Sequence, residues 1–578
     1  MSDVSLSQPA SAGADRSVVR TRPAWPWAIL AMAPLLAAVA STFRLAINGD
    51  VTYVLGSIRA AGLGGVGLSD VFVVRPYLYR LVISGFDHGR QLVTPNQTSW
   101  LAETVVRLQA NVLVALVALL LFAALRRRVS TRSFAGPVAL AVGGALMLAP
   151  NWSFLQPDWV ATVVSVLAVG AALYPRRAWL GVVLGSLAVW SAVAVKTPTA
   201  AWAAIALIAI AAVAWRRAVG VAVGSVLVTG VWYLLTKHFQ PWELTWLKDQ
   251  AAMAQNSPLH HGLRWEDLGK IVQLTANVAV LNPVMMLAPA AAGLIIKRAS
   301  GHRVLATVAL VCVAGLSVAS PYAQGQWFMY HFVGMPVVAA ALWGVALGRR
   351  SAARVPLLIA PLVAVGYTVA VMSRPYAWRK DHLTEAALGA VLIAAVALVV
   401  ALRMDRDAPA EQEQEANAWM FVVGLIAAVL LVVPSLPRAP YAFDAYDANL
   451  SIGSRQTSIG EQYQAIRDEI GADTRVTYLA FGSVIYGLGN PTTCRYPSPL
   501  FLQRATVWPD VTGSRSYADN LKCLDNDGGA KYLVLQPSWF HVKRAAPAVR
   551  QYVAQFDCSP AVRVPDAPAG LLICPRRT

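Results

Sequence analysis

The chain has 578 residues, of which 57% are hydrophobic and 13% are charged, and its mean hydropathy is +0.52. Soluble globular domains carry about 25% charged residues, so the composition excludes an ordinary soluble enzyme and indicates a polytopic membrane protein. The net charge of +18 could suit nucleic acid. Most Lys and Arg residues lie in short loops between apolar runs, however, so they are read as topology signals and no nucleic-acid partner is expected.

Residues 1–26 are polar and basic, and the apolar run that follows has no convincing small-residue cleavage site. We therefore expect a retained cytoplasmic tail rather than a removed signal peptide. A spanning helix needs about 20 apolar residues. About thirteen candidate spans occur within the predicted transmembrane domain 27–435, at 27–46, 104–125, 134–151, 158–174, 179–195, 199–215, 218–236, 272–296, 304–320, 328–347, 355–373, 383–402 and 418–435.

The charge of the loops predicts the orientation of these spans. With the N-terminus inside, every second loop is basic, as cytoplasmic loops are; these loops are 126–132, 175–177, 215–217, 297–303, 348–354 and 403–407. The opposite loops are nearly free of Lys and Arg. We expect a multi-pass protein of the plasma (inner) membrane with a cytoplasmic N-terminus and residues 436–578 outside.

Residues 436–578 are predicted to form an extracytoplasmic α/β domain. Two stretches have the periodicity of amphipathic helices, 459–471 and 542–556, and three read as buried strands, 475–481, 531–536 and 570–574. Four cysteines cluster here: Cys494, Cys523, Cys558 and Cys574. They suggest two disulfides, with three connectivities open, and their spacing does not fit a zinc site, so no metal is predicted.

Ionisable and polar side chains gather on the predicted outer face. Such groups are costly at membrane depth and mark functional sites. Cations suit the phosphate of a lipid ester, and a carboxylate can act as a general base toward an acceptor hydroxyl. The candidates are Asp50, Arg75 and Arg80 after the first span, Asp158 and Lys196 at the ends of the fourth and fifth, and Gln324 and His331 between the ninth and tenth.

Structural roles are the alternatives for the same residues. Asp50 could be a turn residue, Asp158 could cap its helix, and Lys196 could extend to the membrane interface. Arg75 and Arg80 could pair with carboxylates of their own loop.

Four motifs, in this order and with this shared sidedness, resemble the GT-C superfamily of glycosyltransferases, which use polyprenyl-phosphate sugars. They are INGDVTYVLGSIRAAG with RPYLYRLV, LQPDWVATVVSVLAVGAALY, AVAVKTPTAAWAAIAL and YAQGQWFMYHFVGMPVVAAAL, and the likeness covers residues 27–402. The multi-span core with an outer C-terminal domain resembles the aminoarabinose, mannosyl and arabinofuranosyl transferase types. Several relatives carry an acidic pair in the first loop, whereas Val51 follows Asp50 here, which leaves the subfamily and a metal-bridging role open.

The resemblance implies a GT-C-like fold and transfer of a sugar, with inversion, from a polyprenyl-phosphate donor to a cell-envelope glycan, lipid or protein. It implies Asp50 as the general base and Asp158 as a secondary acidic candidate. The candidates for donor phosphate or sugar binding are Arg75, Arg80, Lys196, Gln324 and His331.

Nothing in the sequence indicates a cofactor, although a divalent cation stays open. Besides the donor and acceptor, the expected partners are membrane lipids. The sequence leaves the sugar, the acceptor and the oligomeric state open. The alternatives are a donor with a diphosphate, a transporter or flippase of lipid-linked substrates, and a non-catalytic envelope assembly protein.

Overall fold

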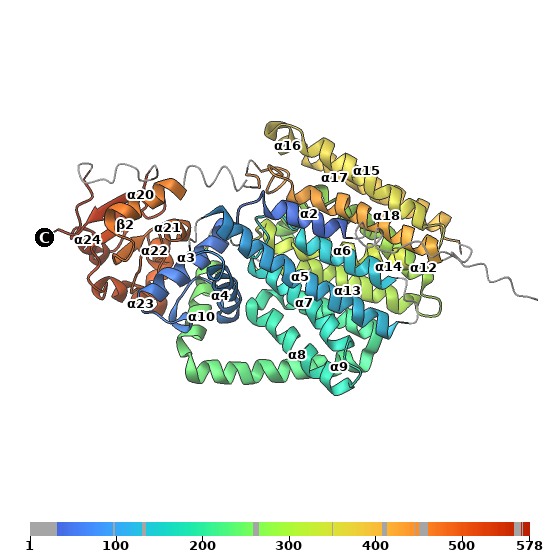
Figure 1. The fold of residues 1–578 in the computed structure, drawn as a ribbon, viewed down its shortest axis with the longest axis horizontal. Helices are drawn as coiled ribbons and strands as arrows, with labels where there is room; N and C mark the ends of the chain where they lie inside the picture. Colours follow the sequence, from blue (N-terminus) through green and yellow to red (C-terminus); the bar gives the residue numbers. More distant parts are fainter. Residues whose placement is uncertain are drawn as a thin grey trace, which may run out of the picture.

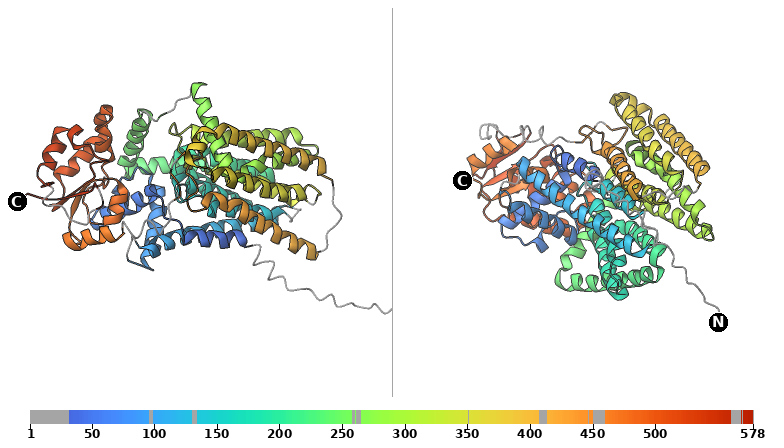
Figure 2. Two further views of the ribbon diagram at one scale, coloured as in Figure 1. Left: turned by 90° about the horizontal axis from the view of Figure 1, so that it is seen from above. Right: turned by 45° about the vertical axis from the view of Figure 1, so that its right-hand side comes forward.

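The computed structural model describes residues 32–95, 99–129, 134–257, 260, 265–349, 351–406, 413–445, 447–449, 460–559, 568 and 570–577. The predicted tail, residues 1–26, lies outside this set. A bundle of long helices forms one part of the molecule and a smaller α/β unit lies at one end of it (Figure 1). Between the two lie α3 (Gly49–Leu63), α4 (Tyr77–Gln91) and α10 (Pro241–Gln255), and Figure 2 shows the same order from two further sides.

Within the described residues, seven helical segments are long and apolar enough to cross a membrane. They contain α5 (Trp100–Arg128), α8 (Ala178–Val195), α9 (Ala200–Phe239), α13 (Arg303–Tyr322), α14 (Gly334–Gly348), α15 (Arg354–Met372) and α17 (Leu383–Met404). The shorter apolar helices are α2 (Ala33–Thr42), α6 (Ala135–Met147), α7 (Pro157–Leu173) and the apolar part of α18 (Glu413–Val432). Two further helices, α11 (Leu268–Leu281) and α12 (Ala288–Arg298), form a pair bent by 99°. The helix α16 (Tyr376–Asp381) has only 6 residues.

Over the described residues, the thirteen predicted spans fall on apolar helical segments; residues 27–31 of the first span lie outside this set, and one span needs correction. The predicted spans 199–215 and 218–236 are both parts of α9. Non-helical dihedral angles at Ala214 (φ −151°, ψ 73°) divide α9 into two helices that meet at a kink next to the predicted loop 215–217. The predicted span 272–296 is broken at Pro283, whose ring and missing N–H interrupt helical hydrogen bonding. The number of membrane crossings stays a prediction.

Small residues allow the bundle helices to approach closely. A Cβ on Gly344 of α14 would lie 2.7 Å from the Val138 Cα of α6, so only glycine fits there. Close backbone approach at small residues is the usual way in which membrane helices pack, since hydrophobic burial alone does not drive them together.

The α/β unit contains a three-stranded sheet with the order β1 (Val476–Leu479), β2 (Tyr532–Leu535) and β3 (Leu572–Pro575). The first pair is parallel, with Val476 opposite Tyr532, and the second is antiparallel, with Tyr532 opposite Pro575. All three predicted strands are confirmed. The unit's helices are α20 (Glu461–Ile470), α21 (Gly482–Leu488), α22 (Leu500–Ala505), α23 (Arg515–Asp525) and α24 (Pro547–Val553), of which α20 and α24 lie within the two predicted helical stretches.

Two disulfides connect elements of this unit, as the cysteine cluster predicts. Cys494 is bonded to Cys523 of α23, and Cys558, which follows α24, is bonded to Cys574 of β3. The structure thereby selects one of the three connectivities that the sequence leaves open.

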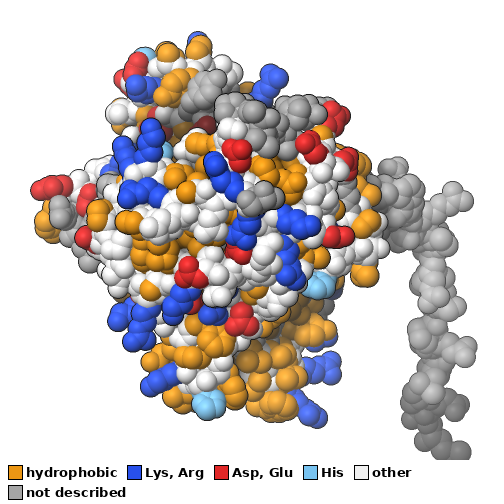
Figure 3. Space-filling view, turned by 90° about the vertical axis from the view of Figure 1, so that its left-hand side faces the viewer, with side chains coloured by type: hydrophobic (Ala, Val, Ile, Leu, Met, Phe, Trp, Pro, Cys, Tyr) orange, Lys and Arg blue, Asp and Glu red, His pale blue; other side chains and the backbone are white. Residues whose placement is uncertain are grey.

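The α/β unit packs closely on the segments that follow the first helix. A Cβ on Gly56 of α3 would lie 2.4 Å from the Tyr486 Cα of α21. Phe72 packs against Trp246 of α10 and against Tyr496, and the Trp246 Nε1–H donates to the Tyr496 hydroxyl at 2.8 Å. Figure 3 views this end of the molecule, where Lys and Arg side chains are spread among fewer Asp and Glu side chains.

A buried ion pair connects α4 to α10. Arg80 Nη2 lies 2.9 Å from Glu243 Oε2, with the two side chains 0% and 2% exposed. The other Glu243 oxygen accepts the Tyr77 backbone N–H at 2.8 Å, at the start of α4. Burial lowers the pKa of the Arg80 guanidinium, and the neighbouring Glu243 carboxylate opposes this shift. The pair therefore fixes the position of α4 and leaves the Arg80 charge compensated.

Peptide mapping of the non-reduced protein is expected to recover Cys494–Cys523 and Cys558–Cys574 as the linked pairs. Closing a loop of roughly 15 residues limits the unfolded chain and stabilises a fold by about 3 kcal/mol. We therefore expect the Cys558→Ser/Cys574→Ser variant to melt at a lower temperature than the parent. A mixed population of pairings in the folded protein would contradict the arrangement.

Replacing Glu243 with Gln should destabilise the protein by about 3–5 kcal/mol, because Arg80 would be left buried without a counter-charge. The melting temperature in detergent measures this loss. The matched variant Arg80→Met/Glu243→Leu removes both charges and should recover most of the stability. Equal losses in the single and double variants would show that packing, and not the ion pair, carries the effect.

Candidate active site

Asp50 lies in the first turn of α3, where local hydrogen bonds orient it. The Asn48 side-chain oxygen caps the helix by accepting the Asp50 backbone N–H at 2.8 Å. Gln156 Nε2 donates to Asn48 Oδ1 at 3.1 Å and to Asp50 Oδ2 at 3.2 Å. Arg75 Nη2 lies 3.8 Å from the same Asp50 oxygen. The Asp50 side chain is 36% exposed, and its Oδ1 accepts no hydrogen bond from the described residues.

The two chain segments that carry these partners have strained backbones. Val74, which precedes Arg75, has φ 58°, and Leu155, which precedes the Gln156 contact, has φ 65°. Side-chain donors hold both carbonyls: Gln250 Nε2 donates to Val74 O at 3.1 Å and the Tyr79 hydroxyl to Leu155 O at 2.7 Å. Burial raises the pKa of Tyr79, which keeps that hydroxyl protonated as a donor. Positive φ at branched residues is rare and concentrates at functional sites.

A second polar cluster surrounds Asp158 in the first turn of α7. Asp158 is fully buried, and its two oxygens have different partners. Lys196 Nζ, between α8 and the turn that starts α9, lies 2.7 Å from Oδ2. Gln324 Nε2, which follows α13, donates to Oδ1 at 2.8 Å. This carboxylate therefore fixes a cation and an amide at the same end of the bundle.

His331 and Tyr330, in the turn before α14, complete the group. Lys196 Nζ lies 5.5 Å from the centre of the Tyr330 ring, and the rings of Tyr330 and His331 meet edge to face with centres 4.4 Å apart. The charges of Asp50 and Arg75 lie close enough to Lys196 to interact with it. Asp50, Arg75, Asp158 and Lys196 thus belong to one polar region.

Several buried polar atoms in this region have no hydrogen-bond partner among the described residues. They are Gln156 Oε1, Gln324 Oε1, His331 Nδ1, Trp152 Nε1 and Ser153 Oγ. A buried polar group left without a partner costs about 1–3 kcal/mol. Each of these atoms can bond to a polar ligand or to water that enters the region.

Of the residues that the sequence singled out, the structure brings together Asp50, Arg75, Asp158, Lys196, Gln324 and His331. It does not bring in the Arg80 guanidinium, which is paired with Glu243. Sequence reasoning missed Gln156 and Tyr330 as members of the group. Gln156 stands two positions before Asp158, and Tyr330 stands directly before His331. Both residues therefore lie within the motifs that the sequence analysis singled out. Within the described residues, no group of three His, Cys, Asp or Glu side chains could hold a metal ion.

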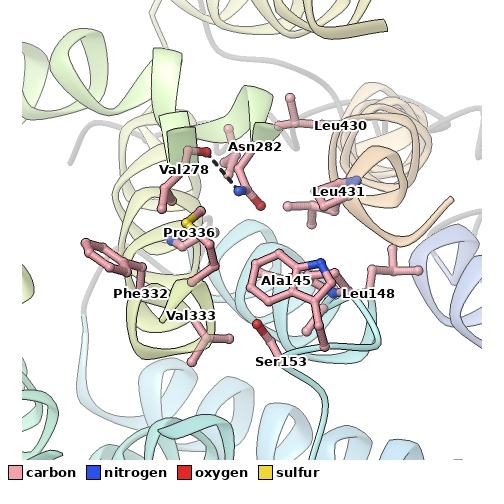
Figure 4. Close-up of a pocket in the computed structure, with 16 residues that line it drawn as sticks. Ala145, Leu148, Ser153, Val278, Asn282, Phe332, Val333, Pro336, Leu430 and Leu431 are labelled. Carbon is pink, nitrogen blue, oxygen red and sulfur yellow. Dashed lines mark hydrogen bonds between the residues drawn. The ribbon is translucent and has the colours of Figure 1, made fainter. Parts of the chain in front are cut away.

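A small cavity of about 30 Å³, lined mainly by apolar side chains, lies beside this group (Figure 4). Phe332 and Val333, which follow His331, form one side of it, and Leu430 and Leu431 of α18 form another. The Asn282 amide at its edge donates to the Val278 carbonyl at 2.8 Å. The polar region is therefore bordered by mainly apolar side chains.

Two solved structures are similar to this chain over nearly its whole length. One is ArnT from Cupriavidus metallidurans in the apo state, with a TM-score of 0.50 and 15% identity over 95% of this chain and 98% of that chain. The other is ArnT from Cupriavidus metallidurans bound to undecaprenyl phosphate, with a TM-score of 0.50 and 16% identity over 96% of this chain and 98% of that chain.

No family model matches the sequence, and no curated protein matches it. At sequence identities this low, the structural similarity establishes a shared fold only. The activity must be inferred from the chemistry of the site. The chain therefore shares the fold of these ArnT structures, in agreement with the membrane-transferase fold that its motifs imply.

Proposed function

We propose that the protein is a membrane glycosyltransferase that moves one sugar from a polyprenyl-phosphate donor to a hydroxyl of a cell-envelope acceptor on the outer face. The observation that carries the proposal is the partly exposed Asp50 carboxylate, 3.8 Å from Arg75 and close enough to Lys196 to interact with its charge. The fold shared with ArnT supports a role of these residues in glycosyl transfer. The ArnT structure with undecaprenyl phosphate supports a polyprenyl lipid as the donor's carrier.

Asp50 is the proposed general base. Its Oδ2 is oriented by Gln156, while its Oδ1 is open to accept a proton. The acceptor hydroxyl oxygen attacks the anomeric carbon of the donor sugar while the hydroxyl proton passes to Asp50 Oδ1. The bond between the anomeric carbon and the phosphate oxygen breaks, and the polyprenyl phosphate leaves. A direct displacement of this kind inverts the anomeric configuration.

Arg75 and Lys196 are the proposed donor-phosphate ligands. Negative charge builds on the phosphate as it leaves, and fixed cations stabilise it more in the transition state than in the bound donor. Asp158 holds Lys196 in place at 2.7 Å and is itself too buried to meet a substrate. Gln324 and His331 each leave one buried polar atom unpaired, which suits hydrogen bonds to the sugar or to the phosphate.

A lipid-borne donor suits the surroundings of this site. The small cavity beside His331 is lined mainly by apolar side chains, which suits contact with the hydrocarbon of a lipid whose polar head lies near Asp50. The α/β unit packs on α3, the helix that carries Asp50, and is the proposed contact for the acceptor. A transporter would instead need access from both sides of the membrane, whereas these charges gather at one end of the bundle.

Replacing Asp50 with Asn should lower kcat about 10²–10⁴-fold, because the amide cannot accept the hydroxyl proton. Donor affinity should change little. Transfer from radiolabelled polyprenyl-phosphate sugar to membrane acceptors measures the rate, and lipid binding is measured separately. Asp70→Asn is the matched control, since Asp70 pairs with Arg495, 3.4 Å away in the α/β unit. Wild-type turnover in Asp50→Asn would exclude the base assignment.

Replacing Arg75 with Gln should raise the KM for the donor about tenfold to a hundredfold, because a hydrogen bond to a charged group contributes roughly 1.5–3 kcal/mol. Arg75→Lys keeps the charge and should recover part of the loss. Arg59→Gln is the control, because the guanidinium of this half-buried arginine on α3 donates to the Pro95 carbonyl at 3.1 Å. An unchanged KM in Arg75→Gln would remove this residue from the donor site.

A further inference from the structure

A basic hollow lies at the opposite end of α5 and α7 from Asp50. It has about 1050 Å³ of empty space, including the part open to solvent, and it is lined by Phe122, Ala123, Arg126, Arg127, Arg128, Tyr174 and Arg176. Four of these seven residues are arginines, and none is acidic. The proposed sugar transfer makes no use of them, since they lie far from the polar region.

The position of the hollow follows from the helices that lead to it. α7 runs from the Asp158 turn to Leu173 at the hollow, and α8 returns from Ala178 to Val195, next to Lys196. With a rise of 1.5 Å per residue, helices of 17 and 18 residues span about 26 Å. This is close to the roughly 30 Å thickness of a bilayer's hydrocarbon core. The hollow and the polar region therefore lie at the two boundaries of one apolar layer.

Some of the nearby cations already have partners within the protein. Arg128 Nε donates to the Leu173 carbonyl at 2.8 Å and Arg127 Nη1 to the Tyr174 carbonyl at 3.3 Å. From α9, Arg217 Nη1 donates to the Ala172 carbonyl at 2.8 Å. These bonds satisfy the C-terminal carbonyls of α7, whose dipole also favours positive charge.

Arg126 and Arg176 have no such partner. Both side chains are exposed, and neither donates a hydrogen bond or forms an ion pair within the described part of the chain. The Arg126 guanidinium stands 5.4 Å from the centre of the Phe122 ring, and that of Arg127 stands 3.8 Å from the Tyr174 ring. Cation–π contacts hold guanidinium groups in position without neutralising their charge.

Cations that only determine membrane topology do not need to line a hollow. Another basic loop at the same end has cations whose charge is compensated within the protein. There Arg298 and Lys297 lie 2.8 and 3.7 Å from the Asp405 carboxylate, which compensates them. The hollow has no such carboxylate, so its ligand must be an anion. Guanidinium groups bind phosphate through paired N–H donors, which makes a phosphate group the best match.

Apolar side chains beside the hollow identify the source of the phosphate. Leu116 and Leu119 of α5 are 59% and 61% exposed along the helix that leads to Arg126, and Trp179 at the start of α8 is 61% exposed. Exposed leucines suit acyl chains, and tryptophan is enriched where a membrane meets water. We propose that the hollow binds the phosphate-bearing headgroup of an anionic phospholipid in the leaflet opposite the Asp50 site.

The test compares the intact protein in nanodiscs of phosphatidylcholine alone and of an equimolar mixture with phosphatidylglycerol. Retained phosphatidylglycerol is counted by native mass spectrometry, and the melting temperature is measured in each lipid. We expect the wild type to retain this lipid and to melt higher in the mixture. Arg126→Gln/Arg176→Gln should bind it about tenfold more weakly and lose most of the shift, because both uncompensated charges are gone.

Arg303→Gln is the matched control, because it removes one exposed cation at the same end, outside the hollow. It should bind phosphatidylglycerol as the wild type does. Equal lipid retention in the double variant and the wild type would overturn the site, as would an equal loss in the control. A similar rise in melting temperature with inorganic phosphate in phosphatidylcholine nanodiscs would overturn the assignment to a lipid. Unchanged melting of the double variant in phosphatidylcholine alone checks that its fold is intact.

Discussion

A backbone in hydrocarbon must satisfy its own hydrogen bonds, so the helices of an apolar bundle end at its edges. Polar side chains can gather at these ends. The candidate site follows this constraint. Asp50 and Asp158 begin helices, Lys196 separates α8 from α9, and Gln324 follows α13. The N-terminal ends of α3 and α7 also carry partial positive charge, which favours both carboxylates and would favour an anionic donor. The breaks in the bundle thus position the site and contribute to its electrostatics.

The two carboxylates of the site differ in a way that separates their roles. Asp158 is fully buried and uses both oxygens, at 2.7 and 2.8 Å from nitrogen donors, so it can neither reach a substrate nor lose a partner cheaply. Asp50 has a cation only at 3.8 Å and one oxygen that no described residue occupies. A base must exchange partners during a reaction, whereas an anchor must keep them. This difference supports the proposed roles of Asp50 in proton transfer and of Asp158 in holding Lys196.

The sequence predicts what depends on local patterns. Apolar runs locate the helices, and short polar motifs at their ends place Asp158, Lys196 and Gln324 in one region. It does not predict pairings between distant segments. Arg80 belongs to the same predicted outer loop as Arg75. In the structure it lies in α4 and pairs with Glu243, 163 residues further along the chain. The disulfide connectivity is a similar case, since it depends on how separate elements dock.

Because α10 contacts both the site loop and the α/β unit, the two are mechanically connected. Its Gln250 holds the strained Val74 carbonyl next to Arg75, and its Asp249 accepts hydrogen bonds from the Ser516 backbone N–H and hydroxyl at 2.8 and 2.7 Å. Backbone strain of this kind costs about 1–3 kcal/mol and persists only where the surroundings impose it. A shift of the α/β unit would reach α10 first and then the position of Arg75. If the acceptor binds that unit, as proposed, this connection gives it a route to the proposed donor ligand Arg75.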